Sequence, residues 1–263
     1  IDAMRSSAAP FELRLGDALL THHGASGSIT SEDHSASWNL EWQPAGPTKL
    51  HLPQNIYTTD FADTRVLSPN WRVRARGTVT LDGTELAFED APLGQTHLWG
   101  RKHAHQWAWG HCNAFPNAPD AALETLTIRL KKGGVVLPPL TLVSLTLDGE
   151  THELTRLRDT AFSRGRYGTA HYEFSARREH VRVRGEFSCR PTDMVLAEYS
   201  DPDGEPSFCA NTEVANLRVN VWRRSGWLSR WRHDVELVAP VSGHFEVAQR
   251  TPDPAISNWH LEA

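Results

Sequence analysis

The sequence of 263 residues has few thiols and no obvious means of cross-linking itself. Its cysteines number only three, an odd number without a C-x-x-C pair, and they stand at Cys112, Cys189 and Cys209. This usage excludes a disulfide framework and offers no cysteine pair of zinc-binding spacing. We expect the three thiols to be buried as small apolar side chains.

The chain also lacks an excess of positive charge and any long apolar run. Its net charge of -5 supplies no basic field for nucleic acid, so no nucleic-acid partner is expected. No segment approaches the ~20 apolar residues of a membrane span, and none is predicted. Ile1–Met4 resembles a cloning remnant and no leader is visible, which favours the cytoplasm. Nothing in the sequence indicates an oligomeric state.

The signatures of several large enzyme classes are missing as well. There is no G-x-S-x-G nucleophile elbow, no P-loop and no G-x-G-x-x-G after a predicted strand. Hydrolase, phosphoryl-transfer and dinucleotide-dependent activities therefore lack their usual marks, and we expect no cofactor.

What the sequence does contain is repeated alternation of apolar and polar residues. Trp71–Arg76 places three apolar side chains on one face and three arginines on the other, and 180–189 follows the same pattern. Asp82-Gly83, Asp148-Gly149 and Asp203-Gly204 predict hairpin turns. Further strands are predicted at 125–130, 135–147, 168–175, 194–199, 213–223 and 233–238. Helical periodicity is limited to 121–126 and 227–232.

These patterns predict an all-β protein of antiparallel strands. Many short strands must protect their edges in a sandwich or by closing into barrels, and we favour two β-barrels in series. The Pro- and Asn-rich stretch 115–120 separates a Trp/His-rich half from an Arg/Val-rich half. We therefore predict an N-terminal barrel at 1–118 and a C-terminal barrel at 119–263.

Aromatic and imidazole side chains are concentrated between residues 94 and 115, in a chain with ten tryptophans and fourteen histidines. A bend within 100–105 is expected, because a single strand from 97 to 113 would be unusually long. After it, alternation aligns Trp107, Trp109, His111 and Asn113 in one row, as in a ligand pocket with apolar walls and a few polar groups. Alternatively, the rings fill a barrel interior and the histidines cap it.

A metal site in this segment is a further possibility that the sequence does not favour. His103 and His105 would share a strand face, and His97 or His111 would complete a ligand set. No carboxylate lies close by in sequence, so we predict no metal.

The segment resembles the lipocalin-like family that includes carotenoid 1,2-hydratase, tocopherol cyclase and the fungal Diels–Alderases. The resemblance rests on Gly94, His97, Trp99 and Gly100, followed by Trp107-Ala-Trp109. A looser match covers Tyr199-Ser-Asp-Pro-Asp-Gly204 and Cys209-Ala-Asn211-Thr-Glu213. It implies two lipocalin-like barrels and cofactor-free hydration, cyclisation or cycloaddition of an apolar polyene or polyketide. Thr96 stands where hydratase-like members tend to carry an acid, which argues against strong-acid protonation of an alkene.

The residues themselves suggest how such a site would work. Imidazole titrates near neutrality, so His97 and His111 are predicted as an acid/base pair. Tryptophan faces stabilise a developing cation. The predicted ligand-binding residues are the walls and the two groups that orient a polar part of the substrate: Trp99, Trp107, Trp109, Arg101 and Asn113. The predicted function is a hydratase, cyclase or isomerase acting on a hydrophobic isoprenoid- or polyketide-like molecule; the alternative is a non-catalytic carrier or sensor of such a ligand.

Overall fold

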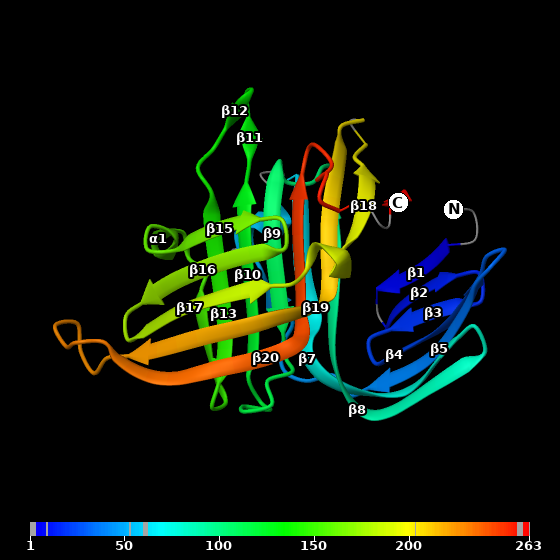
Figure 1. Cartoon of the computed structure of the whole chain (residues 1–263), viewed down its shortest axis with the longest axis horizontal. Coiled ribbons are helices and arrows are strands. Elements are labelled where there is room, and N and C mark those ends of the chain that lie inside the picture. The colour runs from blue at the N-terminus through cyan, green and yellow to red at the C-terminus, as the bar shows by residue number, and fades with distance from the viewer. Residues whose placement is uncertain are drawn as a thin grey trace. The chain divides into compact units, whose positions relative to one another are not determined.

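The chain is almost entirely β-structure, which confirms the predicted all-β class (Figure 1). The structure is a computed structural model and describes residues 4–8, 10–52, 54–59, 63–202, 204–256 and 260–262. Its two large antiparallel sheets are curled, consistent with lipocalin-like barrels. Within these ranges no helix has the length and apolar character needed to cross a membrane.

The strands belong to two compact units. The first comprises Ile1–His51 and Val66–Leu98, and the second comprises Leu52–Arg65 and Trp99–Ala263. The predicted division into two barrels, at 1–118 and 119–263, stays a prediction. In the structure, residues 113–121 connect two strands of the second unit that pair directly with one another.

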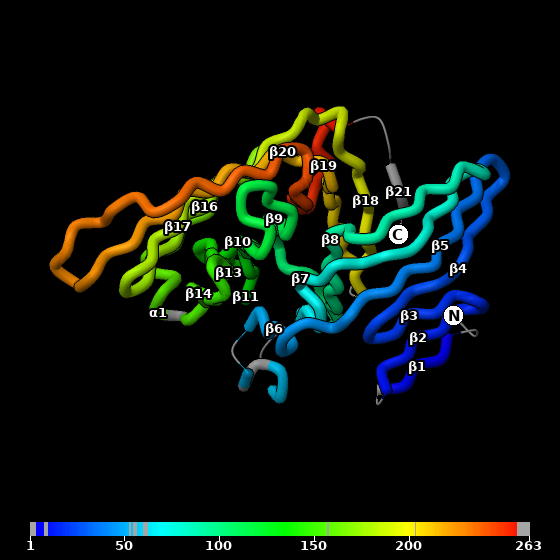
Figure 2. The backbone as a smooth tube through the Cα atoms, turned by 90° about the horizontal axis from the view of Figure 1, so that it is seen from below, coloured from blue at the N-terminus to red at the C-terminus, as the bar shows by residue number. Residues whose placement is uncertain are grey.

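The first unit is built on one sheet with the order β1-β2-β3-β4-β5-β7-β6, and β8 pairs with β7 (Figure 2). Its strands are β1 (Met4–Ala8), β2 (Phe11–Leu15), β3 (Ala18–Thr21), β4 (Gly24–Thr30), β5 (Ser35–Trp42), β6 (Lys49–Leu50), β7 (Thr64–Leu81) and β8 (Thr84–Gly100). Trp42, Val73 and Ala75 form its small buried core. Val73 and Ala75 come from the segment whose alternation predicted a buried face.

The second unit contains an eleven-stranded sheet with the main order β14-β13-β10-β9-β20-β19-β17-β16-β15, while β18 pairs with β19 and β21. Its strands are β9 (Gln106–Cys112), β10 (Ala122–Arg129), β13 (Leu140–Leu147), β14 (Glu150–Leu154), β15 (Arg164–Gly168), β16 (His171–Arg178), β17 (Val181–Ser188), β18 (Val195–Ser200), β19 (Pro206–Arg223), β20 (Arg232–Gln249) and β21 (His260–Glu262). The remaining elements are a small hairpin and three short helices: β11 (Lys131–Lys132), β12 (Val135–Val136), η1 (Gln54–Thr58), α1 (Leu157–Thr160) and η2 (Pro191–Asp193).

Aromatic rings fill the space enclosed by this second sheet. Tyr172, Phe187 and Phe245 are fully buried and nearly parallel, with the Phe187 and Phe245 centroids 6.0 Å apart. The Tyr172 hydroxyl lies 2.9 Å from the hydroxyls of Thr125 and Thr127 on β10, which brings β16 against the far part of the sheet. The interior of the curl is therefore a packed core.

Turn chemistry agrees with the sequence at the two positions that the structure describes. Asp82 and Gly83 both have positive φ, 47° and 79°, at the tip between β7 and β8. Asp148 and Gly149 do the same, at 52° and 76°, between β13 and β14. These are the values that a type I′ hairpin turn requires. In the third predicted turn, Asp203 lies outside the described residues.

Both helical predictions were wrong. Residues 122–126 form part of β10, because β9 and β13 pair with this segment on either side and outweigh the local helix propensity. Residues 227–232 form the turn between β19 and β20 and reach β20 only at Arg232. Trp227 and Leu228 in this turn are exposed, so no apolar face is available to pack a helix.

The close packing of β9 on the aromatic core generates a first prediction. A Cβ added at Gly110 would lie 2.4 Å from the Phe187 ring, whereas one added at Gly168 on β15 would meet nothing within 4 Å. Gly110→Ala should lower the free energy of unfolding in urea by about 1–3 kcal/mol, the usual cost of overpacking. Gly168→Ala should change it by less than about 0.5 kcal/mol. Equal effects of the two substitutions would contradict this account of the core.

Candidate functional site

Strand β9 presents two chemically different faces. Ala108 and Cys112 point into the main core of the second unit. Trp107, Trp109 and His111 lie on the opposite face, as the alternation predicts. Trp107 is buried and the other two are half-buried, and Asn113 follows directly after the strand.

The two tryptophans are tied to carboxylates on the neighbouring strands. The Trp107 indole N–H donates to Glu246 Oε1 on β20 at 2.6 Å. The Trp109 indole N–H donates to Glu124 Oε1 on β10 at 2.9 Å, and Glu124 is buried. Each hydrogen bond joins an indole to a carboxyl group on a neighbouring strand, so both rings are held in fixed orientations.

A charged histidine stands beside this row. His244 on β20 lies opposite His111 in the antiparallel register, and its ring is 4.5 Å from that of Trp109 in an edge-on arrangement. Its Nδ1 is 2.5 Å from Glu213 Oε1, and its Nε2 is 3.8 Å from Glu246 Oε2. Burial alone would lower the pKa of His244, but these two carboxylates raise it to about 9. His244 is therefore charged at neutral pH.

The Glu213 side chain is more exposed than that of its partner His244. Partial burial works to raise the pKa of Glu213, but the hydrogen bond and charge of His244, followed by the charge of His111, lower it overall. An ionised Glu213 and a protonated His244 thus support each other. Trp109 and His111 stack with centroids 6.1 Å apart, which places His111 beside the same charged group.

At the other end of the row, Trp107 belongs to a stack of three rings. His103 lies between Trp107 and Tyr199, with centroid separations of 5.3 and 5.2 Å. Its Nδ1 is 2.6 Å from Asp201 Oδ1, and Asp201 also accepts from the His103 backbone N–H. Burial, with the nearby Cys209 and Glu246, raises the pKa of Tyr199 to about 12, so its hydroxyl remains protonated.

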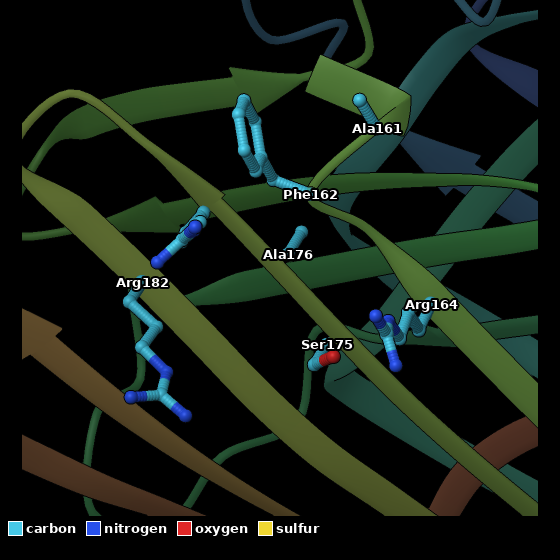
Figure 3. A pocket seen from close by; sticks show the side chains of 7 residues that line it. Ala161, Phe162, Arg164, Ser175, Ala176 and Arg182 are labelled. Atoms are coloured by element: carbon cyan, nitrogen blue, oxygen red, sulfur yellow. The ribbon is translucent and has the colours of Figure 1, made fainter.

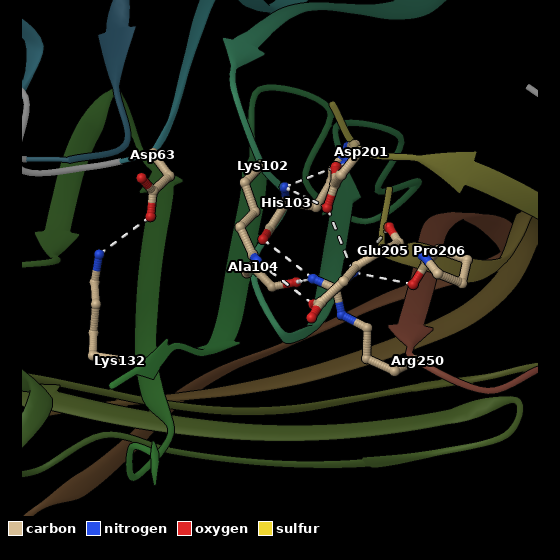
Figure 4. A network of polar contacts seen from close by, with 9 residues as sticks. All are labelled: Asp63, Lys102, His103, Ala104, Lys132, Asp201, Glu205, Pro206 and Arg250. Atoms are coloured by element: carbon tan, nitrogen blue, oxygen red, sulfur yellow. Dashed lines mark hydrogen bonds and ion pairs between the residues drawn. The ribbon is translucent and has the colours of Figure 1, made fainter. Parts of the chain in front are cut away.

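A buried network fixes the segment that carries His103 (Figure 4). Arg250 lies 3.4 Å from Asp201 and donates to the carbonyls of Ala104 and Pro206 at 3.2 and 3.0 Å. These bonds join the end of β20 to residues 101–105, which connect β8 and β9 and contain the expected bend. The His103 Nδ1 atom is thus engaged in a hydrogen bond with Asp201. Within the described part of the chain, no three His, Cys, Asp or Glu side chains gather as metal ligands.

The other predicted residues lie elsewhere in the two units. His97 belongs to the first unit, near the end of β8, with an exposed side chain. Trp99 is half-buried beside Tyr57, with centroids 6.1 Å apart. Arg101 is exposed, and its backbone N–H donates to the Asp63 carbonyl at 2.8 Å. The roles predicted for these residues stay predictions.

The sequence reasoning missed the acidic and charged partners of the row. Glu124, Glu213 and Glu246 were not proposed as site residues, and neither was His244. A signal existed for Glu213 and Asp201, because both belong to the second, looser motif of the resemblance. In the structure the looser motif lies beside Trp107-Ala-Trp109. Tyr199 and Asp201 contact His103, which stacks on Trp107, and Glu213 binds His244 beside Trp109.

Comparison with known proteins gives consistent relatives. An uncharacterized protein of Mycobacterium tuberculosis is 26% identical over 240 residues, covering 88% of this chain and 67% of its own. The probable chloroplastic tocopherol cyclase of rice and the chloroplastic tocopherol cyclase of maize are each 23% identical over 164 residues. Those matches cover 59% of this chain and 34% of each plant protein. A crystal structure from Nitrosomonas europaea, described as AttH, shares 14% identity and a TM-score of 0.43 over 90% of this chain and 69% of its own.

The family model described as "Tocopherol cyclase-like" matches residues 17–246. This span includes most of both units and nearly every residue of the row and its partners. The chain therefore belongs to the tocopherol cyclase-like family.

Proposed function

We propose that the protein is a cyclase acting on a hydrophobic isoprenoid small molecule. The observation that carries the proposal is the pair His111 and His244 beside Trp109, on the face of β9 opposite to the main core of the second unit. The family match and the tocopherol cyclases among the relatives support the substrate class. The matched region spans about a third of those plant enzymes, so their whole activity is not transferred.

Trp107 and Trp109 would form the walls that hold the substrate. Both rings are fixed by carboxylates, so little side-chain entropy is lost when a ligand packs on them. Their faces would pack against the apolar prenyl chain and hold it close to the two histidines. Asn113 and Arg101 remain the proposed contacts for a polar head group.

The two histidines suit opposite proton-transfer roles. His244 is charged at neutral pH because of Glu213 and Glu246, so it can donate a proton or a hydrogen bond. His111, on the neighbouring strand, is the proposed base. His97, in the first unit, stays a candidate for the same chemistry.

The acidity of His244 indicates where its proton can go. A group with a pKa near 9 is a weak acid, poorly matched to an isolated alkene carbon but suited to a carbonyl or quinone oxygen. We therefore propose a prenylated compound with such a head group. His111 removes a proton from the prenyl carbon next to the ring, and His244 protonates the quinone oxygen remote from that carbon, which gives a quinone methide. The unprotonated carbonyl oxygen beside the prenyl group then forms the new C–O bond. The product is an isomer of the substrate, so no oxidant or reductant is needed.

The proposal is tested by incubating the purified protein with a prenylated benzoquinone and, separately, with the corresponding hydroquinone. A ring-closed isomer of unchanged mass, formed from the quinone in D2O without carbon-bound deuterium, is expected. Carbon-bound deuterium in a product from the hydroquinone would instead indicate alkene protonation and overturn the assigned roles. Stoichiometric binding of both compounds without turnover would identify a carrier.

A second prediction concerns His111. His111→Gln should lower kcat at least ~100-fold, the usual contribution of a general base, and should change ligand affinity by less than a few-fold. His171→Gln is the matched control, since His171 is half-buried, like His111, and lies on β16, which does not pair with β9. If His111→Gln lowers affinity and leaves kcat unchanged, the residue is a wall of the site and not its base.

A third prediction follows from the charge on His244. Its folded-state pKa of about 9 lies above the unfolded value near 6.5, so it contributes stability that is complete below about pH 6.5. That contribution, about 2–3 kcal/mol, is lost as the pH rises through 9. Urea unfolding across this range should show a steeper loss for the wild type than for His244→Gln. Parallel curves for the two proteins would show that His244 gains no charge stabilisation on folding.

A further inference from the structure

The turn between β19 and β20 exposes two large apolar side chains. Trp227 is 81% exposed and its neighbour Leu228 is 99% exposed. Side chains this exposed bury almost no surface and contribute little to the fold, while adjacent exposed apolar groups favour association. Both stand at the turn of a long hairpin, where they are accessible to an apolar partner.

The turn is held in one conformation by Arg224. Its guanidinium donates to the carbonyls of Glu179 and Trp227 at 2.6 and 2.7 Å and lies 4.6 Å from the centre of the Trp231 ring. The Ser229 backbone N–H closes the turn onto Gly226 at 3.0 Å. Trp227 and Leu228 are therefore displayed on a structured tip and do not depend on a loose loop for their exposure.

A basic face lies on the sheet that supports this hairpin. It consists of four of the exposed arginines on β15, β16 and β17: Arg164, Arg177, Arg182 and Arg184. Arg177 pairs with Arg182, and Arg182 pairs with Trp222 on β19, so these side chains share one face. The guanidinium of Arg182 lies 5.1 Å from the centre of the Trp222 ring.

These arginines lie together without acidic partners, although the chain as a whole has a net charge of -5 and Glu173 and Glu186 lie further along the same two strands. Among the residues that the structure describes, none of these four arginines has a carboxylate within ion-pair distance, and the same holds for Arg230 and Arg232 beside the tip. Arg164, Arg177 and Arg182 line a cavity of about 250 Å³ (Figure 3). Phe162 at its rim is 54% exposed, with Arg177 4.8 Å above its ring.

We propose that the tip and the basic face dock the second unit on a membrane that carries anionic lipids. Trp227 and Leu228 would enter the headgroup boundary, where an amphipathic indole is favourably placed. Unpaired guanidinium groups would bind lipid phosphates, which they contact in a planar, two-point manner. A nucleic acid would use the arginines but not the fully exposed leucine. The proposal is independent of the cyclase assignment, because binding to vesicles requires no turnover.

The test is cosedimentation of the full chain with phosphatidylcholine vesicles, with and without phosphatidylglycerol. Binding is expected with phosphatidylglycerol, and it should weaken as salt is added because exposed charges are screened. Trp227→Ser combined with Leu228→Ser should lower the partition coefficient at least about tenfold. Arg177→Gln combined with Arg182→Gln should lower it by about fivefold for each charge removed.

The matched control uses the hairpin of β11 and β12, whose Val135 is 63% exposed in the same unit. Val135→Ser combined with Val136→Ser should leave vesicle binding unchanged. Thermal unfolding verifies that every variant folds. The proposal is overturned if the wild type ignores anionic vesicles, or if the tip variant binds them as well as the wild type. A dimer in sedimentation velocity that the tip substitutions abolish would assign the tip to a second copy of the chain and also overturn it.

Discussion

The contact between Gly110 and Phe187 determines what the second unit can do. Because Gly110 has no side chain, the Phe187 ring lies directly against the backbone of β9 and stacks with Phe245 and Tyr172. This fixes which face of β9 is inside. A shift of the register by one residue would exchange the faces and place the tryptophans in a space already filled by rings. The orientation of the Trp/His row is thus a consequence of core packing on its other side.

The same packing decides where a ligand can bind. A lipocalin-type barrel commonly carries its ligand inside, and this requires an interior wide enough for both side chains and ligand. Here four aromatic side chains occupy the interior of the second sheet, with centroids about 6 Å apart. Trp107 and Trp109, which the sequence allowed as interior filling, lie on the opposite face with Glu124 and Glu246. The proposed ligand is therefore expected on that face, beside the half-buried Trp109 and His111.

Local patterns in the sequence were sufficient for the strands and for the row, because both depend on alternation and on turn chemistry within a few residues. Asp82 and Asp148 adopt the backbone conformation that an Asp-Gly hairpin requires, and Val73 and Ala75 are buried as predicted. Non-local effects were missed. The segment starting at Ala122 is a strand only because β9 and β13 flank it. The partners of Trp107 and His103 lie 139 and 98 residues away, and no local pattern encodes such pairings.

These distant contacts also make the site cooperative. Glu246 accepts the Trp107 indole N–H and faces His244, whose other nitrogen is held by Glu213. His244 loses hydration because it is mostly buried, and the two carboxylates offset this cost only when both lie beside it. Removing one carboxylate would leave a partly buried cation and an unpaired indole N–H, so the members of the network cannot vary independently. The charge on His244 is therefore a property of two strand segments together, β19 and β20, and it depends on their register.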